Sequence, residues 1–326
     1  MRYIRQEIFR EIGKKGQEKL SKSTVAVVGI GALGSNSAEL LARSGVGKLL
    51  LVDRDVVELS NLQRQRLFDE SDVGKPKAAA AKEHLSKINS EIKIDFCIDD
   101  LNFDNIGIIL GTKLNLILDC TDNLETRFLI NDFSQKNSIP FVYSSAVGSK
   151  GYVFSIIPCK TACLRCFLKK PVQLDTCGTE GVLNTITSLI SSTQASETIK
   201  ILLNRQHEES LLFFDIWKNE LLKIKVTKRK NCPCCIKSSF EYLSGEKASR
   251  TIKMCGNDIY QIRGRSTTQK EFDELKKRLK KAGKIIDMKH CVNFDSKVTL
   301  FLDGRALVKA KDETEARSLY SKLVGN

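Results

Sequence analysis

The hydrophobic pattern near the amino terminus alternates between short apolar runs and a longer amphipathic stretch. Thr24 to Val28 is a β-branched run, a helical stretch follows to Ser44, and Lys48 to Val52 is a second apolar run that ends at Asp53. Apolar runs of this length are typical of buried strands, and the helical period between them completes a βαβ unit. The sequence therefore predicts two parallel strands joined by a helix.

The alternation continues beyond this unit. Leu114 to Leu118 is an apolar strand, a helix is expected near Glu125 to Lys136, and another strand begins at Pro140 to Ser144. Alternating strands and helices favour an open, mostly parallel sheet whose ligands bind at its carboxyl edge. We therefore predict an α/β fold of the Rossmann-like class.

The pattern restarts after Gly245 as a smaller unit. It contains a strand near Ile259 to Ile262, a lysine-rich helix from Gln269 to Ala282, strands around Ile285 to Val292 and Val298 to Val308, and a final helix from Glu313. We expect two domains, a larger one over residues 1–245 and a small α/β domain over residues 246–326.

Composition describes an ordinary soluble protein, with 41% hydrophobic and 28% charged residues. The amino terminus is charged from its second residue, and serines and threonines dilute the apolar stretch from Gly181 to Leu203, so we expect no membrane segment. Eleven cysteines without a signal peptide fit a reducing compartment. We expect a cytoplasmic protein.

Two Cys-x-x-Cys pairs stand out, Cys163 with Cys166 and Cys232 with Cys235. This spacing lets a tight turn present two thiolates to one tetrahedral zinc ion, and two such turns complete a four-sulfur site. Buried apolar cysteines or a redox pair are the alternatives, but the duplicated spacing and Pro233 inside the second pair favour structural zinc. A closed four-sulfur site leaves no open position for catalysis.

A glycine-rich loop follows the first strand, with Gly29, Gly31 and Gly34 around its turn. Such a loop lets the backbone approach a phosphate at the start of the next helix, and Asp53 lies where a carboxylate accepts hydrogen bonds from a ribose. This fingerprint alone fits NAD, FAD and ATP binders alike.

Cationic and polar residues after Asp53 reduce the number of reactions that the site could catalyse. Arg64 and Lys77 can neutralise the charge of a departing pyrophosphate. Asn61 can contact a phosphate, and Asp122 at a strand end can bind Mg²⁺. A hydride-transfer enzyme needs no such group of cations, so the set favours nucleotidyl transfer.

Taken in order, these motifs resemble those of the ThiF/MoeB/HesA adenylyltransferases, which are related to ubiquitin-activating enzymes. The resemblance covers about residues 1–245 and runs through Arg2-Tyr3-Ile4-Arg5-Gln6, the glycine loop, Asp53, Ser60-Asn61-Leu62-Gln63-Arg64-Gln65, Gly74-Lys75-Pro76-Lys77, Asp119-Cys120-Thr121-Asp122-Asn123 and both cysteine pairs. It implies ATP-dependent adenylation of the carboxy-terminal Gly-Gly of a small ubiquitin-fold sulfur-carrier protein, of the thiamine, molybdopterin or tRNA-thiolation type, with release of pyrophosphate. Activation of a ubiquitin-like protein for conjugation to lysines shares this step and stays an alternative.

The resemblance also implies roles for individual residues. Arg5 would reach the nucleotide of a neighbouring subunit, which implies a homodimer, and Asp122 would hold Mg²⁺. The implied nucleotide-binding set is Gly29, Gly31, Gly34, Asp53, Asn61, Arg64, Gln65, Lys77, Asp122 and Asn123. The implied catalytic set is Arg5, Arg64, Lys77, Asp122 and Cys177.

Cys177 lies just ahead of a helix expected to begin near Val182. A thiol near a helix amino terminus has its thiolate favoured, as a nucleophile that takes an acyl group from AMP requires. In several members of the family a cysteine in the matching loop forms a thioester or acyl-disulfide with the carrier, while other members stop at the adenylate. Neither Cys255 nor Cys291 opens a Cys-x-x-x-x-Arg sulfur-transfer loop, so we expect sulfur to come from another protein, a sulfurtransferase or cysteine desulfurase.

Two other classes of function are disfavoured. The net charge of +14 raises the alternative of a zinc-ribbon nucleic-acid-binding protein, yet the cysteine loops lack exposed aromatics beyond Phe167, and the excess charge is dispersed or lies on a solvated helix face. An NAD-dependent oxidoreductase would need an acid or base for hydride transfer, and none is evident. We do not expect nucleic acid as a partner.

Overall fold

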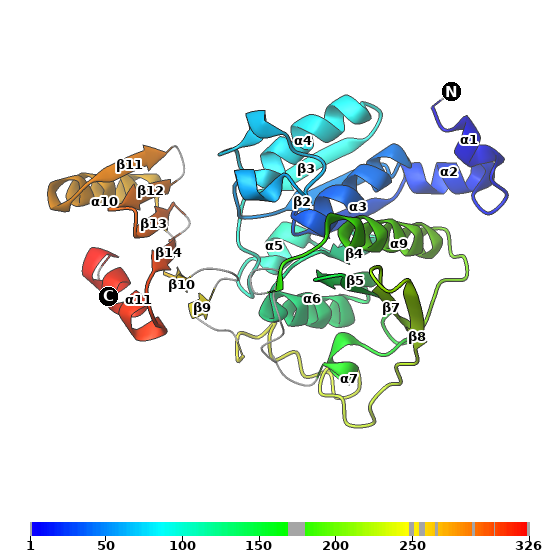
Figure 1. The fold of residues 1–326 in the computed structure, drawn as a ribbon. Coiled ribbons are helices and arrows are strands. Elements are labelled where there is room, and N and C mark those ends of the chain that lie inside the picture. Colours follow the sequence, from blue (N-terminus) through cyan, green and yellow to red (C-terminus); the bar gives the residue numbers. More distant parts are fainter. Residues whose placement is uncertain are drawn as a thin grey trace. The chain divides into compact units, whose positions relative to one another are not determined.

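The structure is a computed structural model that describes residues 2–168, 180–247, 251–253, 258–264, 267–288, 291–302 and 304–324. The chain divides into two compact units, which separate after Lys247. Each unit has its own sheet (Figure 1). The larger unit has two apolar core clusters and the smaller unit has one.

The larger unit is built on an eight-stranded sheet with the order β3-β2-β1-β4-β5-β6-β7-β8. Its strands are β1 (Thr24–Val28), β2 (Lys48–Val52), β3 (Lys93–Cys97), β4 (Leu116–Asp119), β5 (Phe141–Val147), β6 (Lys150–Ile156), β7 (Leu211–Asp215) and β8 (Glu220–Ile224). The strands from β3 to β5 are all parallel, which confirms the predicted Rossmann-like class. From β5 onward the pairs are antiparallel, an extension that the alternation of strands and helices does not predict.

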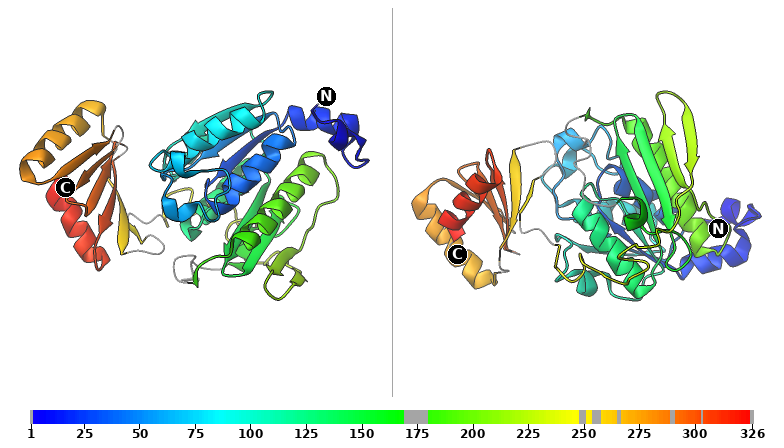
Figure 2. Two further views of the ribbon diagram at one scale, coloured as in Figure 1. Left: turned by 45° about the horizontal axis from the view of Figure 1, so that its top comes forward. Right: turned by 90° about the horizontal axis from the view of Figure 1, so that it is seen from below.

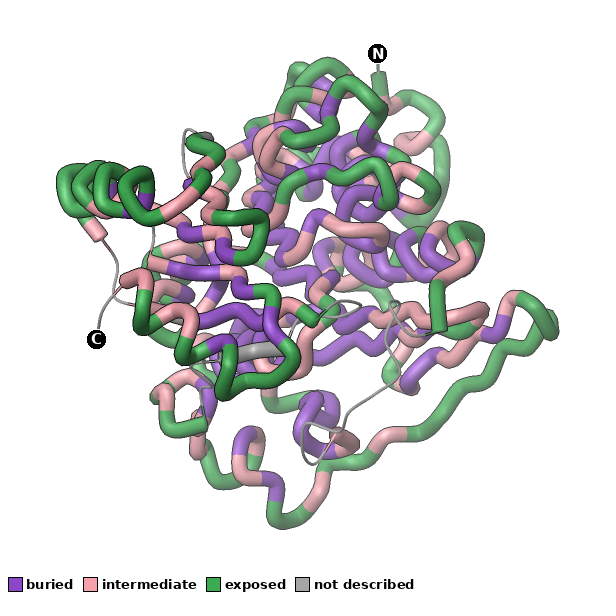
Figure 3. The backbone as a smooth tube through the Cα atoms, turned by 60° about the vertical axis from the view of Figure 1, so that its left-hand side comes forward, coloured by how far each residue is buried: buried purple, intermediate pink, exposed green. Residues whose placement is uncertain are grey.

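Helices cover both faces of this sheet (Figure 2). Val25 and Val27 of β1 face a core shared with α3 (Ala32–Arg43), α4 (Lys77–Ile88) and α9 (Asn184–Leu202). Ala26 and Val28 face the opposite core, which includes side chains of α5 (Ile106–Leu110), α6 (Leu124–Asn137) and α7 (Leu164–Phe167). This alternation within one strand follows from the two-residue period of a β-strand. Buried residues accordingly run through the centre of the fold, while exposed residues line outer loops and helix surfaces (Figure 3).

The hydroxyl and amide groups that interrupt the apolar stretch of α9 make buried hydrogen bonds to neighbouring elements. Ser191 donates to the backbone oxygen of Leu33 at 3.0 Å, and Gln194 donates to the backbone oxygen of Val142 at 3.0 Å. Both side chains are fully buried, so these bonds satisfy groups that would otherwise be costly in the interior. Among the described residues no helix is long and apolar enough to cross a membrane.

The amino-terminal helices α1 (Ile4–Ile8) and α2 (Gly13–Ser21) precede the first strand. Two short 3₁₀ turns, η1 (Leu59–Asn61) and η2 (Glu70–Asp72), follow β2. The Gln6 side chain donates to the backbone oxygen of Ser44 at 2.8 Å. This bond attaches α1 to the carboxyl end of α3, the end away from the glycine loop.

The smaller unit contains a six-stranded antiparallel sheet with the order β11-β12-β13-β14-β10-β9. Its strands are β9 (Thr251–Lys253), β10 (Ile259–Arg263), β11 (Ile285–Met288), β12 (Cys291–Phe294), β13 (Val298–Phe301) and β14 (Arg305–Lys309), and its helices are α10 (Gln269–Ala282) and α11 (Glu313–Val324). The predicted helix over 269–282 is confirmed, and Thr268 and Glu271 form a capping box at its start.

The predicted strand over 298–308 was too long, because it is a hairpin of two strands. Gly304, with a φ of 84°, forms part of the turn between β13 and β14. The predicted strand over 285–292 likewise covers all of β11 and the start of β12. The polar breaks Lys289-His290 and Asp303-Gly304-Arg305 mark these turns in the sequence, and the prediction did not use them.

Candidate nucleotide site and cysteine cluster

Close backbone contacts position the glycine loop after β1. Gly29 has a φ of +87°, and a Cβ at this position would lie 2.7 Å from the backbone oxygen of Cys120. A Cβ on Gly34 would lie 1.8 Å from the backbone oxygen of Gly29. Only glycine fits at either position, so α3 begins directly against the ends of β1 and β4. Its first residue follows Gly31, and no side chain caps this helix start, which leaves the positive end of the helix available to an anion.

Asp53 connects the end of β2 to this loop. Its two carboxylate oxygens accept hydrogen bonds from the backbone N–H groups of Ile30 at 2.5 Å and Asp55 at 2.7 Å. Burial, together with the neighbouring Asp55 carboxylate, raises the pKa of Asp53, although Lys77 acts in the opposite direction. Each oxygen retains a lone pair, so the carboxylate holds the loop and can still accept a further hydrogen bond.

Lys77 is a buried cation at the start of α4. Its Nζ lies 3.4 Å from Oδ2 of Asp55. Burial alone would lower the pKa of Lys77, but the carboxylates of Asp53, Asp55 and Asp122 outweigh it and raise the pKa. The ammonium group is therefore charged at neutral pH, at the edge of the sheet where the glycine loop lies.

The turn from Asp119 to Asn123 presents Asp122 at the same edge. Oδ1 of Asp119 accepts from the backbone N–H and the hydroxyl of Thr121 at 3.1 and 2.7 Å. Oδ1 of Asn123 accepts from the backbone N–H of Thr126 at 3.1 Å and so caps α6. The turn is thus fixed on both sides, while the Asp122 side chain is exposed.

Two arginines at this edge, the partly buried Arg54 and the buried Arg127, were missed by sequence reasoning. Arg54 lies with Nη1 2.7 Å from Oδ1 of Asp100 and Nε 3.6 Å from Oδ1 of Asp55. Arg127 donates to the backbone oxygen of Thr121 and, at 2.9 Å, to the Tyr143 hydroxyl. Burial opposes the charge of both guanidinium groups, but nearby anionic groups, including Asp122, raise their pKa. The sequence signal that could have identified Arg54 was its position between two aspartates at a strand end.

Gln65, in the segment after η1, lies beside the glycine loop. The Nε2 atom of Gln65 lies 3.9 Å from the position that a Cβ on Gly31 would occupy. Asn61 is buried, and its Oδ1 accepts from the backbone N–H of Glu58 at 3.2 Å. Arg64 donates to the backbone oxygen of Ser60 at 2.9 Å. The contacts of Asn61 and Arg64 are thus local ones within this turn.

One expected catalytic residue, Arg5, begins far from this edge in its own chain. Arg5 is exposed on α1, which is attached to the far end of α3. The 12 residues of α3, about 18 Å of helix, separate that end from the glycine loop. Cys177 and Cys255 lie outside the described residues.

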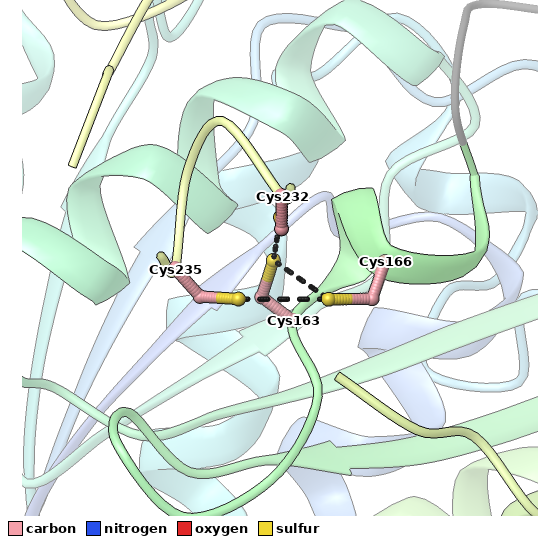
Figure 4. A group of neighbouring side chains, drawn as sticks. All are labelled: Cys163, Cys166, Cys232 and Cys235. Carbon is pink, nitrogen blue, oxygen red and sulfur yellow. Dashed lines mark hydrogen bonds between the residues drawn. The ribbon is translucent and has the colours of Figure 1, made fainter. Parts of the chain in front are cut away.

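The four cysteines of the two pairs converge in the larger unit (Figure 4). Sγ of Cys163 lies 3.9 Å from that of Cys166 and 3.6 Å from that of Cys232, and the sulfurs of Cys166 and Cys235 are 3.5 Å apart. Four sulfurs at about 2.3 Å from one tetrahedral zinc ion would be about 3.8 Å apart. The cluster therefore has the dimensions and the donor chemistry of a metal site.

Cys120 lies outside this cluster and has a different environment. It is buried beneath the glycine loop, and its Sγ donates to Oε1 of Gln194 at 3.2 Å. Burial and the neighbouring Asp119 carboxylate raise the pKa of this thiol to about 12. Cys120 therefore stays protonated at neutral pH and is unsuited to act as a nucleophile.

The model of the ThiF family matches residues 3–234, which is more than half of the chain. The chain belongs to the ThiF family. This ThiF-family chain is 39% identical to the sulfur carrier protein ThiS adenylyltransferase of Bacillus subtilis, and the match covers 99% of both chains. It is also 39% identical to the adenylyltransferase and sulfurtransferase MOCS3 of Culex quinquefasciatus over 72% of its own length, but spans only 55% of that longer protein.

Solved structures support the same fold for this ThiF-family chain. A crystal structure of E. coli MccB superposes with a TM-score of 0.65 at 22% identity and covers 72% of this chain and 75% of that one. At this sequence identity, the similarity is evidence for a shared fold only.

The glycine contacts lead to a stability prediction. Gly29→Ala should lower the free energy of unfolding by about 2–4 kcal/mol, because the new Cβ meets the Cys120 oxygen at a positive φ. Gly107→Ala is the matched control, since nothing lies within 4 Å of its Cβ position and its φ is not positive. We expect this control to raise stability by about 0.5–1 kcal/mol. Urea unfolding of the two variants measures both changes, and equal midpoints would contradict the assigned contact.

Proposed function

We propose that this chain uses ATP to adenylate the carboxy-terminal Gly-Gly of a ubiquitin-fold sulfur-carrier protein and releases pyrophosphate. The observation that carries the proposal is the end-to-end similarity to a protein named as a ThiS adenylyltransferase. The site agrees with this chemistry, because a charged buried lysine, an exposed carboxylate and an uncapped helix start lie at one edge of the sheet.

The roles of the residues follow from charge. A carboxylate that attacks the α-phosphorus approaches a polyanion, so the site must supply positive charge. Lys77 supplies it in a fixed position, and Arg64 can supply more if it exchanges its contact with the Ser60 oxygen for a phosphate. Asp53 accepts from the ribose, while the glycine loop, Asn61, Gln65 and Asn123 line the nucleotide.

Asp122 is the residue that would hold Mg²⁺. Its carboxylate is exposed, follows β4 and faces the cationic groups of the site. Oxygen ligands of this kind are what Mg²⁺ prefers, and an ion held there would supply positive charge that favours reaction at the phosphates. The protein contributes a rigid turn that fixes Asp122, through Asp119 on one side and Asn123 on the other.

Arg5 completes the positive charge if a second copy supplies it. The attachment of α1 to the far end of α3 favours a role for Arg5 outside the site of its own chain. We therefore propose a homodimer in which each subunit places Arg5 near the nucleotide of the other.

Zinc is the metal that best fits the cysteine cluster. Four thiolates at tetrahedral separations form a closed site, so Cys163, Cys166, Cys232 and Cys235 would stabilise the fold and leave no position for substrate. We assign this site a structural role in the larger domain, residues 1–245. The small domain, residues 246–326, is not required by this chemistry.

Sulfur would enter from a separate protein. The MOCS3 relative is named as both adenylyltransferase and sulfurtransferase, and this chain spans about half of its length. We therefore propose a sulfurtransferase or cysteine desulfurase as a partner. Cys177 is the candidate for a covalent link to the carrier.

The first functional test is exchange of labelled pyrophosphate into ATP. We expect exchange only when a carrier ending in Gly-Gly is present, and Asp122→Ala should reduce it by about 100-fold or more, because the metal ligand is lost. Asp104→Ala, which removes another exposed carboxylate beyond the end of β3, is the control and should retain activity. Exchange without a carrier would overturn the assignment, and full activity of Asp122→Ala would remove this residue from the site.

The second test concerns zinc. We expect one zinc per chain, and Cys232→Ser should lose the metal and melt at a lower temperature, because the free energy of metal binding is coupled to folding. Cys159→Ser alters an exposed cysteine outside the cluster and should keep both properties. Metal analysis and thermal unfolding give the answer. Full zinc occupancy in Cys232→Ser would refute the ligand set.

The third test separates the two stages of the reaction. Cys177→Ala should retain carrier-dependent exchange, since adenylation needs only the phosphate-binding groups and Mg²⁺. If the wild type forms a covalent carrier adduct on a non-reducing gel, the variant should lose it. A wild type that forms no adduct would stop at the acyl-adenylate, and a separate protein would complete the chemistry. An adduct that persists in the variant would assign the link to another thiol.

A further inference from the structure

The side chain of Asn131 lies between the two cysteine turns. Asn131 belongs to the middle of α6 and has 0% of its surface exposed. Its Oδ1 accepts from the backbone N–H of Leu164 at 2.8 Å, and its Nδ2 donates to Sγ of Cys234 at 3.2 Å. Leu164 lies inside the first Cys-x-x-Cys turn and Cys234 inside the second. One amide therefore contacts both halves of the cluster without being a ligand itself.

Adjacent groups tie the same region together. Oδ2 of Asp132, also fully buried, accepts from the backbone N–H of Tyr242, a residue that follows the second turn. Arg165 of the first turn pairs with Glu241 at 2.6 Å. Neither of these two contacts joins the turns directly, whereas the Asn131 amide bonds to both.

Holding the two cysteine turns at a fixed separation would favour metal binding. The two turns come from segments separated by 69 residues, and four thiolates at these distances repel one another when no metal neutralises them. A metal site gains affinity when its ligands are already held at the required separation, because less ordering is needed on binding. Groups outside the ligand set commonly supply this order.

We propose that Asn131 is a positioning residue for the four-cysteine site, which holds the two turns at the separation that one metal ion requires. The proposal rests on the zinc assignment made above. In this arrangement the amide uses its acceptor on one turn and its donor on the other, so neither hydrogen bond can be replaced by a shorter or apolar side chain.

The alternative is that Asn131 only supports the fold. Replacing a buried amide would then destabilise the metal-loaded and the metal-free protein by equal amounts. A positioning role predicts a different result, because weaker binding reduces the stabilisation that zinc adds to the folded state. The difference between the two melting temperatures therefore separates the explanations.

The experiment compares full-length Asn131→Ala with Asn137→Ala. Asn137 lies on the same helix and donates only to the backbone oxygen of Phe133 at 2.9 Å, so its variant loses a local bond and leaves the cysteine turns intact. Zinc release to a chromogenic chelator is timed at a temperature where all variants are folded. We expect release from Asn131→Ala to be about 10–100-fold faster than from the wild type, and release from Asn137→Ala to be unchanged.

Changes at Cys234 provide a second route that keeps Asn131 in place. Cys234→Ala removes the acceptor of the Asn131 amide and should release zinc faster than the wild type. Cys234→Ser restores an acceptor and should bring the rate back towards the wild-type value. This pair keeps the proposal testable if Asn131→Ala does not fold.

Three outcomes would overturn the proposal. They are equal release from Asn131→Ala and Asn137→Ala, equal release from Cys234→Ala and Cys234→Ser, or an undiminished melting difference between loaded and chelator-treated Asn131→Ala. A wild-type protein without zinc would overturn both this proposal and the ligand assignment. Pyrophosphate exchange, measured separately, reports on the adenylation proposal and does not depend on either.

Discussion

A buried lysine can stay charged only where carboxylates surround it, and this requirement governs the carboxyl edge of the larger sheet. Lys77 is almost completely buried, and Asp53, Asp55 and Asp122 keep it protonated. Asp53 and Asp122 follow β2 and β4, the two strands that flank β1 in parallel. The strand order thus places two acidic side chains around the position where α4 begins. Under the proposed function, a nucleotide phosphate that binds there would meet a lysine that is already charged.

The sequence supported those parts of the fold that depend on local pattern. The parallel strands, the helix over 269–282 and the pairing of the cysteine turns follow from apolar periodicity, a capping box and a duplicated spacing. Asp53 and Asp122 could be placed at strand ends for the same reason. The hairpins of the smaller unit were merged into long strands because their short polar breaks, Lys289-His290 and Asp303-Gly304-Arg305, were not used as turn signals.

Other features depend on partners that are distant along the chain. Arg54 is partly buried beside Asp100, and Asn131 bonds to Cys234 from 103 residues away. The flanking aspartates mark Arg54 in the sequence but do not reveal its pairing with Asp100. No local pattern distinguishes Asn131 from other polar residues within a helix. The placement of Arg5 is a different case, since its own chain holds it far from the glycine loop.

The separation of the cysteine turns has a consequence for how the chain folds. Residues Cys163 and Cys232 are 69 positions apart, and α9, β7 and β8 lie between them. Closing a loop of this length lowers the entropy of the chain before any contact between the two turns forms. We therefore expect the four sulfurs to come together late in folding. During synthesis the glycine loop, α3 and α4 emerge well before Cys232. If the cluster holds zinc as proposed, a shortage of the metal would leave the parallel half of the sheet assembled and the end of this unit without its anchor, and so more open to proteolysis.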